Sequence, residues 1–364
     1  MNDAQVYSGQ IKNGQFHGKG KLELTDKSET YEGDFESGKR HGIGFYRFQS
    51  GATYEGEWKN DAIHGQGVAK FESGNIYTGQ WEDSVLQGAG RLEYKNGDVY
   101  DGDWEKGKMN GQGSYTYRNG DVYKGQWKDD RRHGDGKVQY KNEQGQNEES
   151  YEGKFKDGQM HGEGIYKFQE GAEYIGQWEN GKMHGKGRYV FPNGNVYTGQ
   201  WVNDVKCGEG EFMYDSGECY IGQWKDDQVS GRGKLKYISG DEYDGEWNKG
   251  VKEGSGTLTY KKGDVFTGKW IDDNAEGYGV YTYANGNKYE GEWSANQRHG
   301  EGRMLCKGDD SVYVGQYSLG RRDGGGSITF STGNKISGNW KSGRLKDVTA
   351  FQFCEKSSWL DVEL

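Results

Sequence analysis

A short phrase containing a tyrosine, a glycine and a second aromatic residue recurs along the whole chain. It reads YEGEW from Tyr54, YTGQW from Tyr77 and YDGDW from Tyr100. Fifteen copies start at positions 7, 31, 54, 77, 100, 123, 151, 174, 197, 220, 243, 266, 289, 313 and 336, and eleven of the fourteen intervals are 23 residues. Phe266 and Ile336 replace the tyrosine in two copies, and Ile11 replaces the second aromatic residue in the first. A fixed period of this length indicates a repeat architecture in which each copy is one supersecondary unit.

Inside each repeat, the order of residue types predicts a first β-strand. Tyr54, Gly56 and Trp58 are two residues apart, so they point to one face of the strand, while Glu55 and Glu57 point to the other. The glycine leaves a gap on the aromatic face, in which we expect a neighbouring ring to lie.

A turn and a second strand complete the predicted hairpin. Seven residues after the start of each repeat stands Gly, Asp, Asn or Ser, the types that tolerate left-handed turns. The phrase HGQG at 64–67 follows, and the repeat closes on a turn that is often Asn-Gly, as at Asn96 and Gly97. That dipeptide is a strong hairpin signal. No window sustains a helical period of 3.6 residues.

These hairpins predict an all-β fold. We expect an elongated, single-layer, twisted antiparallel sheet, a solenoid-like rod of about fifteen tandem hairpins. Two strands per repeat at ~4.8 Å spacing would give ~10 Å per repeat and ~140 Å in all. The repeat array is predicted to span 1–345 and a C-terminal cap or dimerisation segment 346–364. The insertion at 141–150 is predicted to enlarge one surface loop.

Composition narrows the function classes. The net charge of −10 disfavours a nucleic-acid binder, which usually presents a basic face. Four cysteines without a CxxC pair fit a reducing cytosol rather than a disulfide framework. No signal peptide or run of 18 apolar residues is visible. We therefore expect a cytoplasmic protein, neither secreted nor membrane-spanning.

Catalytic candidates are explained by the repeat itself. All seven histidines occupy the same place before the first glycine of the HGxG phrase, where a catalytic base would be a single special residue. Glycine runs such as 324–326 lack the strand-to-helix context of a phosphate loop. We predict a non-enzymatic chain without cofactors. Cys306, followed by Asp309 and Asp310, leaves open a zinc ion shared between subunits, although a buried free thiol is the commoner outcome.

The eighth and ninth residues after each repeat start form the most informative variable pair. These thirty positions contain twelve Lys or Arg and no Asp or Glu. We expect them to line one edge of the sheet as a basic and apolar row suited to lipid headgroups or an acidic partner, unless turn geometry alone excludes acids there. The candidate binding residues are Lys39, Arg40, Arg131, Arg132, Lys182, Arg298, Arg321 and Arg322.

The pattern Y-x-G-x-W-(x)6-H-G-x-G resembles the MORN repeat, from Tyr7 to about Leu345. The resemblance implies a twisted single sheet. A stand-alone array of this length is similar to the MORN scaffold proteins of apicomplexan and kinetoplastid protists. It therefore implies a homodimer joined through the C-terminal repeats and a place, peripheral to the membrane, in cytoskeleton that acts in cell division or budding. Phosphoinositide-binding adaptors and ciliary or membrane-junction scaffolds are the alternatives.

The last repeat supplies the residues expected at the dimer interface. Arg344-Leu345-Lys346-Asp347 replaces the HGxG phrase, and apolar residues follow it. A terminal repeat must cap or pair the open edge of the sheet. The interface candidates are Ile336, Trp340, Phe351, Phe353 and Trp359.

Overall fold

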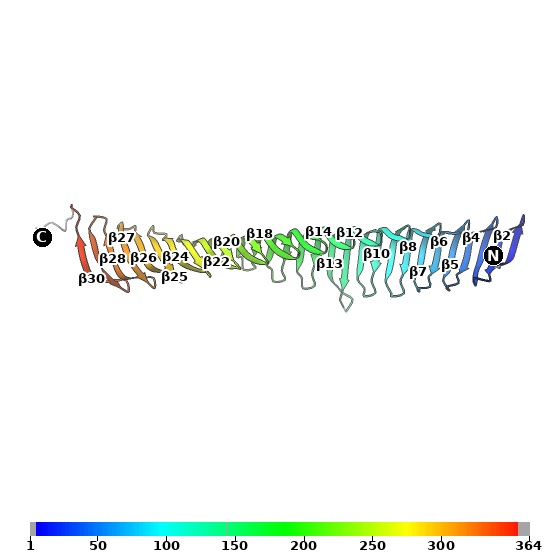
Figure 1. The fold of residues 1–364 in the computed structure, drawn as a ribbon, viewed down its shortest axis with the longest axis horizontal. Coiled ribbons are helices and arrows are strands. Elements are labelled where there is room, and N and C mark those ends of the chain that lie inside the picture. The colour runs from blue at the N-terminus through cyan, green and yellow to red at the C-terminus, as the bar shows by residue number, and fades with distance from the viewer. Residues whose placement is uncertain (1–4, 143, 356–364) are drawn as a thin grey trace. The chain divides into compact units, whose positions relative to one another are not determined.

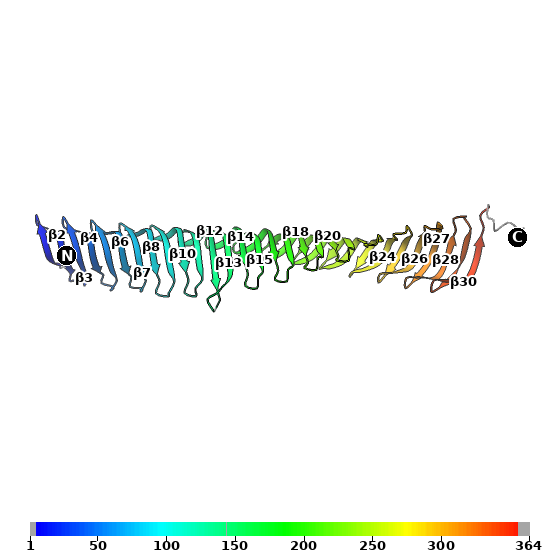
Figure 2. The same cartoon turned by 180° about the vertical axis from the view of Figure 1, so that it is seen from behind.

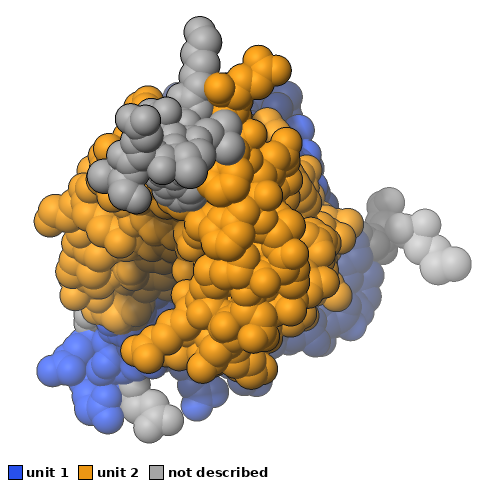
Figure 3. Space-filling model, turned by 90° about the vertical axis from the view of Figure 1, so that its left-hand side faces the viewer, with its two compact units in different colours: residues 1–184 blue, residues 185–364 orange. Residues whose placement is uncertain are grey.

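The computed structural model describes residues 5–142 and 144–355. These residues contain 30 β-strands and no helix, and the strands form one open antiparallel sheet. The chain divides into two compact units, residues 1–184 and 185–364, which Figure 3 colours separately. The predictions of an all-β fold and of fifteen tandem hairpins are therefore confirmed.

Unit 1 contains the first seven hairpins. Its strands are β1 (Gln5–Lys12), β2 (Gln15–Leu24), β3 (Glu29–Glu36), β4 (Lys39–Arg47), β5 (Thr53–Lys59), β6 (Ala62–Lys70), β7 (Ile76–Glu82), β8 (Val85–Glu93), β9 (Val99–Glu105), β10 (Lys108–Thr116), β11 (Val122–Lys128), β12 (Arg131–Lys141), β13 (Asn147–Lys156), β14 (Gln159–Lys167) and β15 (Glu173–Glu179).

The division between the units falls within β16 (Lys182–Val190). The later strands are β17 (Val196–Val202), β18 (Val205–Met213), β19 (Cys219–Lys225), β20 (Gln228–Lys236), β21 (Glu242–Asn248), β22 (Val251–Thr259), β23 (Val265–Ile271), β24 (Asn274–Thr282), β25 (Lys288–Ser294), β26 (Gln297–Cys306), β27 (Ser311–Ser318), β28 (Arg321–Thr329), β29 (Lys335–Lys341) and β30 (Arg344–Gln352). Within each unit the strands follow one another in chain order (Figures 1 and 2).

Each strand pairs antiparallel with its sequence neighbours. In the hairpin of β5 and β6, Trp58 lies opposite Ile63 and Gly56 opposite Gly67. Across to the next hairpin, Gly67 lies opposite Gly79. The glycines of successive strands therefore lie side by side in a row across the sheet.

Two kinds of turn connect the strands. Between β5 and β6, Asn60 and Asp61 have φ of 51° and 72°, the two consecutive positive values of a type I′ turn. Between β6 and β7 the chain closes a longer turn, in which the Phe71 amide donates to the Asn75 carbonyl at 2.9 Å. The left-handed turn residues expected from the sequence are confirmed.

The HGxG phrase forms a bulge in the second strand. Register shifts between Gly56 and Trp58, because 64–66 face a single residue of β5. Gly65 has a φ of 58°, and the bulge amide of Gln66 donates to the Glu57 carboxylate at 2.9 Å. The polar residue between the glycine and the tryptophan thus has a structural role that the sequence pattern alone did not reveal.

The core of the hairpins is a ladder of rings on one side of the sheet, which we call the ring face. Tyr54 lies edge-on to Trp58 of its own repeat at 5.4 Å and to Trp81 of the next repeat at 5.6 Å between ring centroids. The Tyr54 hydroxyl donates to the Glu57 carbonyl at 3.0 Å, and burial raises the pKa of this phenol well above its usual range. The same edge-to-face contacts recur along both units.

The glycine gap is filled by the repeat's own tyrosine. A Cβ atom added to Gly56 would lie 2.5 Å from the Tyr54 hydroxyl and 2.5 Å from the Cα atom of Gly67. The expectation that a neighbouring ring occupies this gap is therefore wrong. The neighbouring tryptophan contacts the edge of the tyrosine ring instead.

The insertion after the sixth repeat mainly lengthens strands. β12 has 11 residues and β13 has 10, against 7 to 9 in most other strands. The two strands still meet in a short turn, where the Asn142 amide donates to the Gln146 carbonyl at 3.0 Å. The extra residues are thus absorbed largely by strand pairing rather than by a wide loop.

Candidate functional site

The predicted basic row separates into two sets on opposite faces of the sheet. Successive residues of a strand point to opposite faces, so the eighth and ninth residues of a repeat cannot share a face. Lys39, Arg131, Lys182 and Arg321, at the eighth position, are exposed. Arg40, Arg132, Arg298 and Arg322, at the ninth position, are partly buried on the ring face.

The ninth residue covers the aromatic ladder. The Arg40 guanidinium carbon lies 4.5 Å from the centre of the Trp58 ring and 5.1 Å from that of Tyr46. In other repeats apolar residues occupy this position; Ile63, Met109 and Ala275 are buried, and most of the others are half-buried. Either a cationic or an apolar side chain can occupy this position, because both types cover the rings, and the cations do so through cation–π contacts.

Acidic turn residues neutralise several of these cations. The carboxylate of Asp61 lies 3.2 Å from the Arg40 guanidinium and accepts the Arg40 backbone amide at 2.9 Å. Lys206 is placed similarly, with Asp227 at 3.9 Å and Trp224 under its ammonium group at 5.1 Å. Burial lowers the pKa of Lys206 from its usual value. These contacts explain the ninth-position cations without any external ligand.

The exposed cations lie next to turns of different charge. Lys108 forms a 3.0 Å ion pair with Asp129, a turn residue of the next repeat. The turns at 295–296, 319–320 and 342–343 contain no acidic residue. Arg321 and Arg344 are exposed beside these turns, and Leu319 is 77% exposed at the tip of one of them. The longest run of successive turns without an acidic residue is therefore at 295–343.

The last strand presents an apolar edge. Among the residues that the structure describes, β30 pairs only with β29, and all nine residues of the strand are exposed. Phe351 and Phe353 are 55% and 41% exposed, and their rings are parallel with centroids 6.4 Å apart. Trp340 is buried under this strand and Ile336 is half-buried. Trp359 lies outside the described residues.

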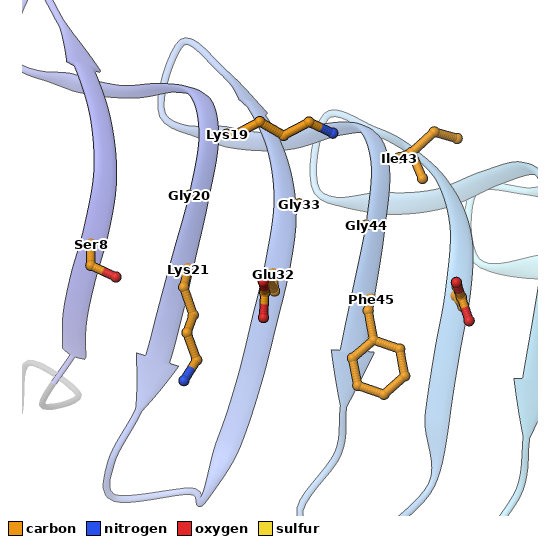
Figure 4. A pocket seen from close by; sticks show the side chains of 10 residues that line it. Ser8, Lys19, Gly20, Lys21, Glu32, Gly33, Ile43, Gly44 and Phe45 are labelled. Atoms are coloured by element: carbon orange, nitrogen blue, oxygen red, sulfur yellow. The ribbon is translucent and has the colours of Figure 1, made fainter.

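The face opposite the rings carries a shallow hollow over the glycine row. Figure 4 shows Gly20, Gly33 and Gly44 in a row without side chains, between two rows of larger residues. The hollow has a volume of about 600 Å³. Its charged lining is mixed, and Lys19 pairs with Asp34 at 2.9 Å, so it offers no concentrated charge to a ligand.

The zinc candidate has other contacts in this structure. Asp309 accepts the Ser311 hydroxyl at 2.7 Å, and Asp310 pairs with Lys307 at 3.0 Å. Over 5–142 and 144–355, no group of three His, Cys, Asp or Glu side chains is arranged to hold a metal. An ion shared between subunits at Cys306 stays a prediction.

The histidines have no common catalytic partner. His41 and His184 each place Nε2 3.4 Å from a glutamate carboxylate on the adjoining strand. Both histidines sit in the bulge, with Nδ1 buried.

In the described part of the chain, no helix is long and apolar enough to cross a bilayer.

Structural relatives share little with this chain. The TCP domain of SAS-4 from Drosophila melanogaster, solved with a proline-rich motif of Ana2, is 14% identical and covers 43% of this chain and 85% of its own, with a TM-score of 0.30. The TCP10 domain of CPAP from Danio rerio is 12% identical, covers 72% and 99%, and has a TM-score of 0.22. Scores this low support no functional inference. A search of curated proteins gave no match.

The family comparison is decisive. The MORN repeat profile matches residues 7–29, 31–53, 54–76, 77–99, 100–122, 123–144, 151–173, 174–196, 197–219, 220–242, 243–265, 266–288, 289–311 and 313–335. These fourteen matches coincide with the first fourteen hairpins, and the fifteenth, formed by β29 and β30, is the one that lacks both glycines of the HGxG phrase. Such repeats are typical of non-catalytic scaffolds or membrane-binding proteins. The chain belongs to the MORN repeat family.

Proposed function

We propose that this protein is a non-catalytic scaffold of a membrane-associated cytoskeletal structure that acts in cell division or budding. It works as a homodimer joined through its last repeats and binds cytoskeletal proteins. The observation that carries the dimer is the terminal strand β30, which exposes Leu345, Val348, Phe351 and Phe353 beside an unpaired strand edge. An apolar edge of this kind is a template for pairing with a second chain.

A partner on this edge would cover a ring that is left exposed in the last repeat. In six other repeats, an aromatic ring at the position of Phe351 contacts the tryptophan of the following repeat, as Tyr46 contacts Trp58 at 5.8 Å. Among the described residues no following repeat covers Phe351. A second copy of the same strand would bury both phenylalanines, which makes a symmetric interface self-complementary.

Small-angle scattering with mass determination tests the dimer. The full chain is expected to have twice the mass of its sequence, and Phe351→Ser with Phe353→Ser is expected to give monomers. The control is Ile11→Ser with Val6→Ser, which removes exposed apolar residues from the opposite edge strand β1. A monomeric wild type, or dimers that persist in the Phe351→Ser, Phe353→Ser variant, would contradict the proposal.

Binding to anionic headgroups is the second candidate function, favoured by the acid-free turns at the C-terminal repeats. Arg321, Arg344 and the exposed Leu319 combine charge with an apolar tip, which suits an acidic lipid surface. A ciliary or membrane-junction scaffold would use the same surface.

Vesicle co-sedimentation separates this candidate from pure protein scaffolding. Arg321→Glu with Arg344→Glu should abolish sedimentation with phosphoinositide vesicles, and rising salt should weaken wild-type binding by screening. Lys108→Glu is the control, because Lys108 already pairs with Asp129. Equal sedimentation of wild type and the double variant would exclude the lipid site.

A further inference from the structure

One repeat lacks a side chain that every other repeat supplies to the ring face. Fifteen residues after the repeat start, the third repeat has Ala69. The other fourteen repeats carry Leu22, Tyr46, Leu92, Tyr115, Val138, Tyr166, Tyr189, Phe212, Leu235, Leu258, Tyr281, Met304, Ile328 and Phe351 at this position. Ala69, which is itself 5% exposed, is therefore much smaller than its counterparts in an otherwise continuous row of larger side chains.

Six repeats show where the missing group would lie. In them an aromatic ring at this position lies 4.4–4.6 Å from the ring two residues later in the chain. The same ring lies 5.8–6.0 Å from the tryptophan of the following repeat. In the third repeat the corresponding walls are Phe71 and Trp81, and Phe71 is 39% exposed.

A cavity of about 540 Å³ occupies this place. Its apolar lining comes from three successive repeats of unit 1 and comprises Phe48, Trp58, Ile63, Ala69, Phe71 and Trp81. We propose that the cavity binds the phenyl side chain of a phenylalanine from a partner polypeptide, at the place that an internal ring fills in the six other repeats.

The surroundings favour phenylalanine over tyrosine. Where the row contains tyrosine, the hydroxyl of Tyr46, Tyr115 or Tyr281 donates to a carboxylate 17 residues earlier, at 2.6–2.9 Å. The equivalent position for the third repeat is Ala52, which also lines the cavity. A phenol hydroxyl would lack that acceptor, and an unpaired buried hydroxyl is costly.

The size and rim of the cavity favour a polypeptide over a free small molecule. The cavity is much larger than one ring, so flanking main chain can lie beside the anchor. Ser50 and Ser84 lie at its two ends, and each hydroxyl accepts a backbone amide, which leaves its O–H free to donate to a partner carbonyl.

Fluorobenzene is a suitable first probe, observed by fluorine NMR, because it presents a single benzene-sized ring to the site. The wild-type chain is expected to bind one equivalent. Ala69→Phe and Ala69→Leu fill the cavity internally and should weaken this binding about tenfold or more. Adding Tyr115→Ala to Ala69→Phe opens the equivalent place in the fifth repeat and should restore one equivalent.

A competing peptide tests the source of the phenyl group. Acetyl-Gly-Glu-Phe-Ser-Gly-amide is expected to displace fluorobenzene from the wild type, and the same peptide with alanine for phenylalanine should not. Absence of fluorobenzene binding, binding unchanged by both Ala69 variants, or no restoration by Tyr115→Ala would overturn the site. Fluorobenzene binding without displacement by the peptide would overturn the polypeptide as its occupant. None of these outcomes depends on dimerisation.

Discussion

The tyrosine that starts thirteen of the fifteen repeats determines which of their glycines are required. Its ring lies flat over two glycines on neighbouring strands, and its hydroxyl is held by a carbonyl three residues later, as with Tyr313 and Gln316 at 3.1 Å. These glycines have no Cβ because the ring takes that space. Their requirement is steric, whereas glycines at the bulge and turns are needed for positive φ.

The fourteenth repeat offers a matched pair of adjacent glycines. A Cβ at Gly326 would lie 2.5 Å from the Tyr313 hydroxyl, whereas a Cβ at Gly325 would have no neighbour within 4 Å. We expect Gly326→Ala to reduce the free energy of unfolding by about 2–3 kcal/mol through overpacking. Gly325→Ala should change it by less than about 0.5 kcal/mol. Equal effects in urea denaturation would contradict the steric role of the ring.

Acid should destabilise the twelfth repeat through one carboxylate. Asp264 accepts from Lys262 at 2.7 Å, Tyr281 at 2.6 Å and the Ala284 amide at 2.8 Å, which together lower its pKa to about 2. A carboxyl pKa lower in the folded than in the unfolded state stabilises the fold at neutral pH, and this stabilisation disappears as pH falls from about 4 to about 2.

The Asp264→Asn variant isolates this effect. Wild type should be more stable than the variant at neutral pH, and the difference in melting temperature should shrink toward about pH 2. A difference that is the same at both pH values would show that the carboxylate charge is not the cause.

Which face a residue occupies was only partly predictable. The period of two correctly places Tyr54 and Trp58 on one face. The same period puts the eighth and ninth residues of each repeat on opposite faces, so the basic row is not one surface. The residue types contained the missing signal. The ninth position holds only cationic or apolar residues, whereas the eighth also holds glutamine and asparagine. A position that tolerates arginine and methionine but no neutral polar residue covers an apolar surface.

At the scale of the element, each hairpin is stabilised by the acceptor that closes its bulge. Asp, Glu or Gln stands between the glycine and the last aromatic residue in most repeats, and Gln126 accepts the Asp135 amide at 2.9 Å. The sequence predicted hairpins and their turns, because Asn-Gly and left-handed residues mark them directly. It did not predict the bulge, because pairing of 64–66 with one residue depends on register across the strands.

Removing one acceptor tests the bulge. Gln126→Met keeps the shape of the side chain but cannot accept the Asp135 amide, so the free energy of unfolding should fall by about 0.5–1 kcal/mol. Gln126→Glu retains an acceptor and is the control. If urea denaturation gives the two variants the same stability, the hydrogen bond does not stabilise the bulge.

At the scale of the whole molecule, the described strands of each unit pair only with their neighbours in the chain. The middle hairpins are covered on both sides, whereas β1 and β30 each have one paired edge. Stability in such an array is close to a sum of repeat and nearest-neighbour terms. The fold was predictable because one hairpin repeats fifteen times. The pocket beside Ala69 could not be predicted from the sequence, because it is lined by side chains from three successive repeats.

Nearest-neighbour stability predicts that damage stays local. Gly113→Ala places a Cβ 2.5 Å from the Tyr100 hydroxyl, so β9, β10 and β11 should lose protection in hydrogen exchange. Amides of β3 to β5 and of β25 to β27 should keep wild-type protection, because none of these strands pairs with the damaged hairpin. The matched variant Gly326→Ala should instead reduce hydrogen-exchange protection in β27, β28 and β29 and leave protection in β10 unchanged. Uniform loss in either variant would mean that the array unfolds as one cooperative block, and that contacts beyond neighbouring strands carry its stability.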